Sequence, residues 1–276
     1  MRLGGGVTAF SILLRTIWRA FLIVVGGLLI ATAAAVAMRV SPMVLELTPS
    51  GSHSSGRIEV QNVLPQNLAF ETRVTRLTFN DEGVATETPA DEDFLIVPPQ
   101  TTLTPGARQV IRVQYVGSPT IEASQSYYVS INQLAVPMAP VTDQRAGVQV
   151  QIVYNMKALV VVAPPNAEPN VSAVTARAIQ VRPPAEQGQA PPPEGPGVEV
   201  TLRNTGQRHA FMGSIRWRLE GRGMDGRSLR VDIAADALSG LIGTGYIGPN
   251  GGQRIFRLPV PAPFSSTAPI RVSFVR

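Results

Sequence analysis

Alternation of apolar and polar residues constrains this chain more than any other feature of its sequence. After residue 40 the alternation recurs in short runs, each closed by a turn signal such as NDEG at 80–83. Ile58 and Val60, for example, would face one way, and Glu59 and Gln61 the other. A period of two is typical of half-buried strands, and 24 prolines with 25 glycines suit many short strands joined by turns. The pattern predicts an all-β chain built from antiparallel β-sandwiches.

The predicted strands fall into two groups. The first group occupies residues 38–163, and a second β series occupies residues 164–276. The stretch APPNAEPN at 163–170 lies between them, and its prolines favour a stiff, extended connection. The second series contains a polar Pro/Gly loop at 183–197, which cannot bury a core. We therefore predict two immunoglobulin-like β-sandwich domains joined by a short Pro-rich hinge.

The N-terminus has the pattern of a secretory signal peptide. Arg15 and Arg19 precede an uncharged run that is rich in small residues and ends in Ala35-Val36-Ala37, a small-x-small cleavage site. We expect residues 1–37 to be removed after Ala37, which places the mature chain beyond the inner membrane, in the periplasm. The run is also just long enough to span a bilayer, so an uncleaved membrane anchor is the alternative.

Residues that could support catalysis or metal binding are few. The absence of cysteine excludes disulfides, thiolate zinc sites and cysteine nucleophiles. His53 and His209 do not have metal-ligand spacing, and the acidic turns at 81–82 and 91–93 lack the ligand pattern of a calcium loop. The glycine-rich 239–248 segment is not followed by a predicted helix, so a phosphate cradle is not expected. We predict neither an enzyme nor a cofactor or metal site.

Positive charge comes almost entirely from arginine. Of the 24 lysine and arginine residues only Lys157 is a lysine, and the arginines are scattered rather than gathered into a nucleic-acid surface. Lys157 lies in the stretch VQVQIVYNMKALVVVAPP, from Val148 to Pro165. There the apolar even-numbered residues share one face and Lys157 lies on the other. Taken alone, this is an ordinary strand with a solvated lysine.

The order of motifs around this strand changes that interpretation. Pro98-Pro99 follows a strand, Leu103-Thr104-Pro105-Gly106 forms a turn, and Arg112 lies on the next strand. An aromatic strand from Tyr127 to Pro137 and the strand from Val148 to Pro164 follow. In this order and spacing the first domain resembles the periplasmic pilus-assembly chaperones of the chaperone–usher pathway. Its start, SPMVLELTPSG, is most similar to the branch that serves archaic-type pili, whereas the second domain matches only in pattern.

The resemblance implies a function and a site. Pilus subunits are sandwiches that lack a final strand, and the chaperone lends its own strand by donor-strand complementation, a known mode of strand addition. An outer-membrane usher then takes the complex. The donor positions fall on Val148, Val150 and Ile152, with Tyr154 extending the row. Lys157 falls on the lysine that grips the C-terminal carboxylate of the subunit.

One departure from the family concerns the second basic residue of this anchor. The family usually supplies an arginine on the first strand, where this chain has Met43. Arg39 has the same strand parity but lies four residues earlier, and Arg112 and Arg73 could approach from other strands. The sequence therefore leaves open whether Lys157 acts alone. It also leaves open whether the free chain caps its donor strand by dimerising.

A second class of function competes with the chaperone. A secreted or membrane-anchored immunoglobulin-like module with a structural or adhesive role would show the same strands and turns. Such a module would keep its N-terminal segment, or would be exported beyond the periplasm.

Overall fold

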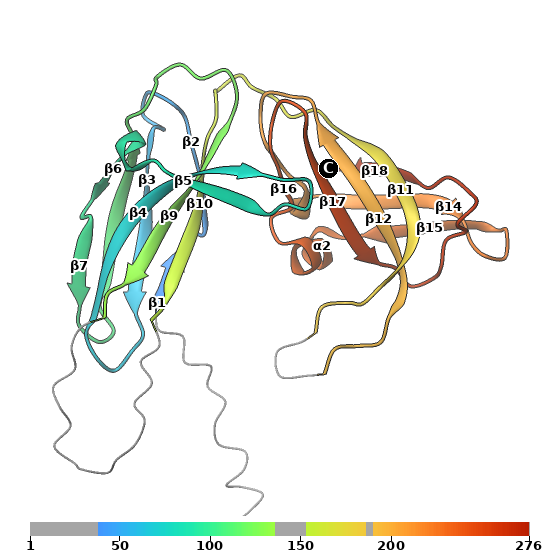
Figure 1. The fold of residues 1–276 in the computed structure, drawn as a ribbon, viewed down its shortest axis with the longest axis horizontal. Coiled ribbons are helices and arrows are strands. Elements are labelled where there is room, and N and C mark those ends of the chain that lie inside the picture. The colour runs from blue at the N-terminus through green and yellow to red at the C-terminus, as the bar shows by residue number, and fades with distance from the viewer. Residues whose placement is uncertain (1–37, 136–152, 186–189, 276) are drawn as a thin grey trace, which may run out of the picture. The chain divides into compact units, whose positions relative to one another are not determined.

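The computed structural model describes residues 38–135, 153–185 and 190–275. Strands dominate this part of the chain, and they form two separate groups of sheets (Figure 1). Strands β1 to β10 make the first group and strands β11 to β18 the second. The prediction of an all-β, two-domain chain is confirmed.

The first sandwich consists of two sheets packed face to face. Its strands are β1 (Met38–Ser41), β2 (Val44–Leu47), β3 (Ser55–Asn62), β4 (Leu68–Phe79), β5 (Ala85–Pro89), β6 (Phe94–Val97), β7 (Gln100–Leu103), β8 (Arg108–Tyr115), β9 (Gln125–Gln133) and β10 (Asn155–Val162), with a 3₁₀ turn, η1 (Asp91–Asp93), before β6. One sheet has the order β1-β3-β8-β6 and the other β2-β10-β9-β4-β5, with β7 also pairing with β4. Strand β2 runs parallel to β10, whereas the other pairs are antiparallel.

Alternation along the strands builds the core of this sandwich. Ile58 and Val60 of β3 are fully buried, as are Ile111 of β8 and Tyr127 of β9, so the two inner faces meet through every second residue. The strands on the two sides of Pro98-Pro99 belong to different sheets, because β6 pairs with β8 and β7 pairs with β4. Proline lacks the N–H that a central strand donates, so the chain leaves one sheet and enters the other at this point.

The second sandwich contains shorter sheets. Its elements are β11 (Val171–Val181), β12 (Gly195–Asn204), β13 (Ala210–Phe211), η2 (Met212–Ser214), β14 (Arg216–Arg222), β15 (Ser228–Ile233), α2 (Ala235–Ile242), β16 (Tyr246–Ile247), β17 (Gly252–Pro259) and β18 (Arg271–Val275). They form sheets of order β11-β12-β17, β15-β14-β18 and β13-β16. Trp217 is fully buried in the core of this sandwich, and its ring packs against those of Phe256 and Phe274.

Two local features of the second sandwich differ from the sequence-based expectation. Helix α2 was not predicted, although Leu238, Leu241 and Ile242 have helical spacing and pack on the core. Its eight residues overlap the glycine-rich segment, and this obscured the short apolar pattern. The predicted loop at 183–197 is also shorter than expected, because its last residues, from Gly195, pair with β11.

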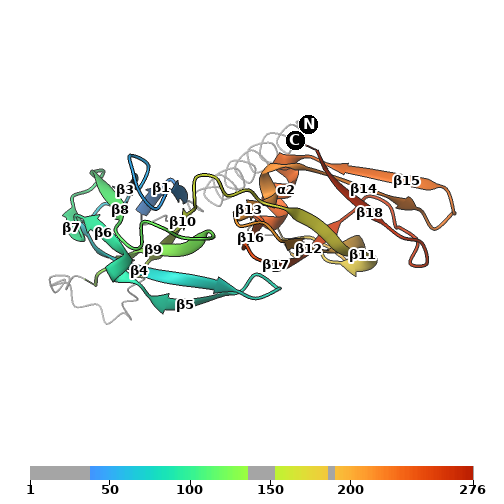
Figure 2. The ribbon, with the colours of Figure 1, turned by 90° about the horizontal axis from the view of Figure 1, so that it is seen from above.

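The hairpin of β4 and β5 extends to strand β17 of the second sandwich (Figure 2). The backbone N–H of Ile255 donates to the carbonyl of Asp81 at 2.8 Å, and Arg257 binds both carboxylate oxygens of Glu82 at 3.1 and 3.3 Å. The acidic turn at 81–82 is thus part of a contact between the two sandwiches. Across the described ranges, no helix is long and apolar enough to cross a membrane.

Candidate functional site

Strand β10 presents different side chains on its two faces. The even-numbered residues Ala158, Val160 and Val162 belong to the core of the first sandwich. Leu159 and Val161 lie on the opposite, outer face, in a second apolar cluster that includes Tyr246 of the second sandwich. Lys157 has the parity of Leu159 and therefore faces outward, immediately before this cluster. The lysine thus lies beside the contact between the two sandwiches.

The edge of β10 is only partly covered. Strand β9 pairs with β10 from Asn155 to Val162, whereas β2 pairs with its other edge only from Leu159 onward. In the part of the chain that the structure describes, no strand pairs with Asn155–Ala158 on that side. An uncovered strand edge presents N–H and C=O groups to which another chain can add a strand.

The predicted donor positions precede this open edge. Val148, Val150 and Ile152 lie outside the described residues. Tyr154 is described, and its half-buried side chain packs against the core of the first sandwich, as does that of Met156. Of the predicted donor positions, the structure therefore describes only Tyr154, on the face of the strand that fills the core.

Register places the residues of the outer face in rows that cross β4, β9 and β10. Arg73 pairs with Ser130, and Ser130 pairs with Lys157. The next row towards the second sandwich contains Tyr128 and Leu159. Residues directly opposite one another in antiparallel strands share a face, so Arg73 and Lys157 flank Ser130 on one surface.

Lys157 contacts an acidic and an aromatic side chain on this face. Its Nζ donates to Oε1 of Glu87 on β5 at 2.5 Å and lies 5.5 Å from the centre of the Tyr128 ring. Thr75 donates to the other oxygen of the same carboxylate at 2.8 Å. The hydrogen bond from Lys157 is the main reason that the pKa of Glu87 is lowered. The lysine side chain remains 37% exposed, so a carboxylate from solvent can reach it.

The structure does not bring the other two predicted anchors to Lys157. Arg112 pairs with Arg57 in the opposite sheet and points outward, because its neighbours Ile111 and Val113 fill the core. Arg39 likewise points outward from β1 in that sheet. Packed sheets lie about 10 Å apart, so these guanidinium groups and the amine of Lys157 extend from opposite faces of the sandwich.

Met43 does lie beside β10. Its carbonyl accepts the N–H of Leu159 at 2.9 Å, and its side chain is 40% exposed. The place expected for the family arginine is therefore next to the lysine strand but carries no charge.

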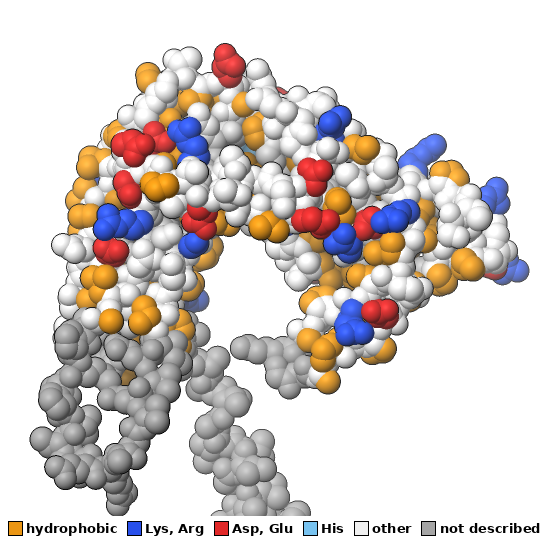
Figure 3. Space-filling model, in the orientation of Figure 1, with side chains coloured by type: hydrophobic (Ala, Val, Ile, Leu, Met, Phe, Trp, Pro, Cys, Tyr) orange, Lys and Arg blue, Asp and Glu red, His pale blue; other side chains and the backbone are white. Residues whose placement is uncertain are grey.

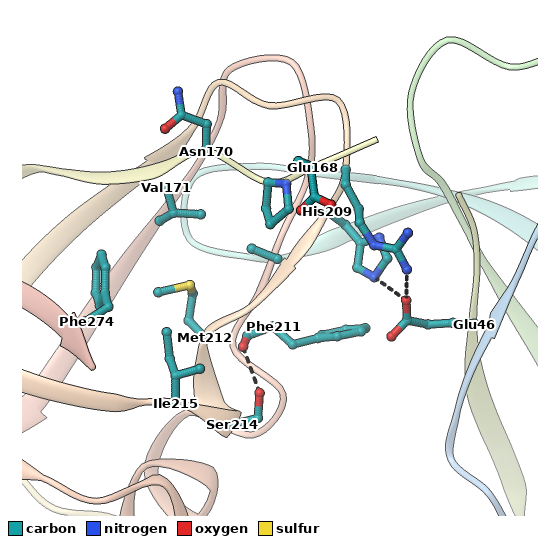
Figure 4. Close-up of a pocket in the computed structure, with 13 residues that line it drawn as sticks. Glu46, Glu168, Asn170, Val171, His209, Phe211, Met212, Ser214, Ile215 and Phe274 are labelled. Atoms are coloured by element: carbon teal, nitrogen blue, oxygen red, sulfur yellow. Dashed lines mark hydrogen bonds and ion pairs between the residues drawn. The ribbon is translucent and has the colours of Figure 1, made fainter. Parts of the chain in front are cut away.

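A cavity of about 750 Å³ lies mainly along the second sandwich (Figure 4). Apolar side chains of Phe211, Met212 and Phe274 line one part, and Glu46 of β2 marks its polar end. There Arg208 donates to Glu46 at 2.6 Å, and Nε2 of His209 lies 3.5 Å from the same oxygen.

Histidine and arginine together stabilise the charged form of Glu46. The hydrogen bond from His209, with further help from Arg208, lowers the pKa of Glu46 from 4.5 to about 2, although burial acts in the opposite direction. His209 is buried, and its Nδ1 lies 3.1 Å from Oγ of Ser124. The spacing of the histidines in the sequence gave no sign of this contact. Because each group already has a protein partner, the arrangement serves as a polar contact between the sandwiches rather than as a reactive centre.

Charged side chains of both signs are intermixed on the visible surface (Figure 3). Many of them form ion pairs, such as Arg218 with Asp232 at 2.7 Å and Arg177 with Glu199 at 2.6 Å. Within the described ranges, no group of three or more histidine, aspartate or glutamate side chains is arranged to hold a metal ion.

Comparison with known proteins gives one family match. The model of the PapD N-terminal domain, from pili and flagellar-assembly chaperones, matches residues 39–168. This range contains the whole outer face of β4, β9 and β10 described above. A search of the curated proteins finds no match.

Similar solved structures include several chaperones of pilus assembly. The SafB chaperone of Salmonella enterica, solved with SafA pilin, is 12% identical with a TM-score of 0.49, over 88% of this chain and 99% of the solved chain. A CsuC–CsuE chaperone–subunit complex from Acinetobacter baumannii is 10% identical with a TM-score of 0.44, over 82% of this chain and 91% of the solved chain. The CupB2 chaperone of Pseudomonas aeruginosa is 13% identical with a TM-score of 0.43, over 86% of this chain and 93% of the solved chain.

Proposed function

We propose that this chain binds pilus subunits by donating a strand to them, because residues 39–168 match the family model of the pili and flagellar-assembly chaperones. Residues 148–154 supply the donor strand, and Lys157 binds the C-terminal carboxylate of the subunit. The chain then delivers the capped subunit to an outer-membrane usher. Members of this family are folding and assembly chaperones rather than enzymes.

The open edge of β10 at Asn155–Ala158 is the observation that carries this proposal. A subunit strand paired with this edge would continue along the donor residues, whose apolar side chains would enter the groove that the missing strand leaves. Lys157 lies on the opposite face of β10, beside the second sandwich, where a chain end can bind without displacing the donor row.

Affinity and register come from different groups. Burial of an aliphatic side chain contributes roughly 1.5–3 kcal/mol, so Val148, Val150 and Ile152 together outweigh one charge-assisted hydrogen bond, itself worth about 1.5–3 kcal/mol. A slip of one residue would turn every donor side chain to the wrong face. A carboxylate fixed at Lys157 prevents that slip, so the main role of the lysine is to set the register.

Three substitutions test the mechanism in cells that also express a pilus subunit lacking its final strand. We expect Val150→Asp to abolish co-purification of the subunit, because the charge would enter an apolar groove. Val153→Asp makes the same change on the opposite face and should leave binding intact. Lys157→Ala should fold normally, as judged by its thermal melt, yet retain little subunit. Equal subunit recovery with all three variants would disprove strand donation.

We also propose that residues 1–37 are a signal peptide and that the mature chain works in the periplasm. N-terminal sequencing of the chain recovered from a periplasmic extract should begin at Met38. A chain that retains Met1 and sediments with membranes would instead favour an anchored module.

A further inference from the structure

We propose that Arg73 is the second cation of the carboxylate-binding site, which it forms together with Lys157. This inference rests on the proposed function, because it assumes that Lys157 receives the chain end of a subunit. It assigns a binding role to strand β4, which lies two strands away from β10.

Sheet register brings the two cations together. Arg73 and Lys157 are both direct neighbours of Ser130, one on each side of β9. Adjacent strands lie 4.7–4.9 Å apart, which places the two Cα atoms about 10 Å from each other. Both long side chains start on the same face, and the buried Ser130 between them is short. The two oxygens of one carboxylate can therefore be bound from both sides.

The side chains of both cations are accessible. The side chain of Arg73 is 60% exposed, and its only ion pair among the described residues is with Glu71, at 3.2 Å. Lys157 is paired with Glu87, as described above. Each cation thus already binds a carboxylate of its own chain, which shows that carboxylates fit at both positions.

Glu87 is the competing group in this site. It reaches Lys157 from β5, and its carboxylate lies where the carboxylate of an incoming chain end would have to bind. Removing its charge should therefore strengthen binding of an external carboxylate, whereas removing the charge of Arg73 should weaken it. The other arginines considered, Arg39 and Arg112, extend from the opposite sheet and should have no effect.

N-acetylglycine is a suitable probe because it mimics a peptide C-terminus, and N-acetylglycinamide provides the uncharged control. Ligand-detected NMR of the acetyl methyl group can compare affinities across all variants. Because Lys157 is the only lysine of the sequence, ¹³C-lysine labelling also gives a single side-chain signal that reports on the site itself.

Arg73→Gln should weaken binding of N-acetylglycine about two- to fivefold, the range of solvent-exposed ion pairs. Glu87→Gln should strengthen binding by a similar factor. Arg112→Gln removes the same charge from the opposite sheet and should leave affinity unchanged. Arg73→Lys should restore part of the loss, which separates a charge effect from a folding defect. N-acetylglycinamide should bind to none of the variants.

Two outcomes separate this inference from the proposed function. If Lys157→Gln abolishes binding while Arg73→Gln behaves like Arg112→Gln, Lys157 is an anchor without Arg73 and the inference is wrong. If Lys157→Gln leaves binding intact, the carboxylate anchor of the proposed function itself fails.

Discussion

The hydrogen bond between Tyr246 and Ser126 connects the two sandwiches, and its removal allows a quantitative test. Their hydroxyl oxygens lie 2.5 Å apart, and both residues are 4% exposed. Tyr246→Phe keeps the ring packing but leaves the buried hydroxyl of Ser126 without a partner. An unsatisfied buried polar group costs about 1–3 kcal/mol, so we expect a loss of that size in the free energy of unfolding.

The double mutant gives the sharper measurement. With Ser126→Ala added to Tyr246→Phe, both polar groups are gone, so the double mutant should be more stable than the two single losses predict. The expected coupling energy is about 1 kcal/mol, within the range for groups in contact. In thermal unfolding each kcal/mol corresponds to roughly 2–4 °C for a chain of this size.

Tyr128→Phe serves as the matched control. Tyr128 lies in the same apolar cluster, but its hydroxyl makes no hydrogen bond to any described residue. Its removal should shift the melting temperature little. Strict additivity of Tyr246→Phe and Ser126→Ala, or a loss for Tyr128→Phe as large as that for Tyr246→Phe, would refute the reasoning.

Two further predictions concern buried polar groups. Glu46→Gln should lower the free energy of unfolding at neutral pH. Because the pKa of Glu46 is lowered from 4.5 to about 2, its carboxylate stabilises the fold only while it is ionised. In acid-unfolding curves the difference in stability between the variant and the parent should therefore shrink as the pH falls from about 4.5 to about 2. Asn62→Ala should lower the free energy of unfolding in urea by about 1–3 kcal/mol, because the fully buried amide donates to the carbonyls of Leu103 and Thr104. Asn80→Ala, in an exposed turn, is the control, and a smaller loss for Asn62→Ala than for Asn80→Ala would contradict this.

Alternation along the chain was enough to predict the class of fold and the two faces of the strand that contains Lys157. The parity of residues 148–157 separated the apolar row from Lys157, and the structure confirms that even positions from Met156 onward turn to the core while Lys157 turns outward. Parity is a local property, because successive side chains of a strand point to opposite faces whatever that strand pairs with. The order of motifs added the family, which the match over residues 39–168 supports.

Tertiary structure alone decided which distant residues share a face. The sequence did not decide among Arg39, Arg73 and Arg112, and only strand pairing placed Arg73 in the row of Lys157 and the other two in the opposite sheet. The contact of Glu46 with His209 was equally hidden, because it joins residues that no repeat or motif connects. Each strand carries its own two faces in its sequence, but its neighbours are chosen by how whole sheets pack, which is a property of the complete fold.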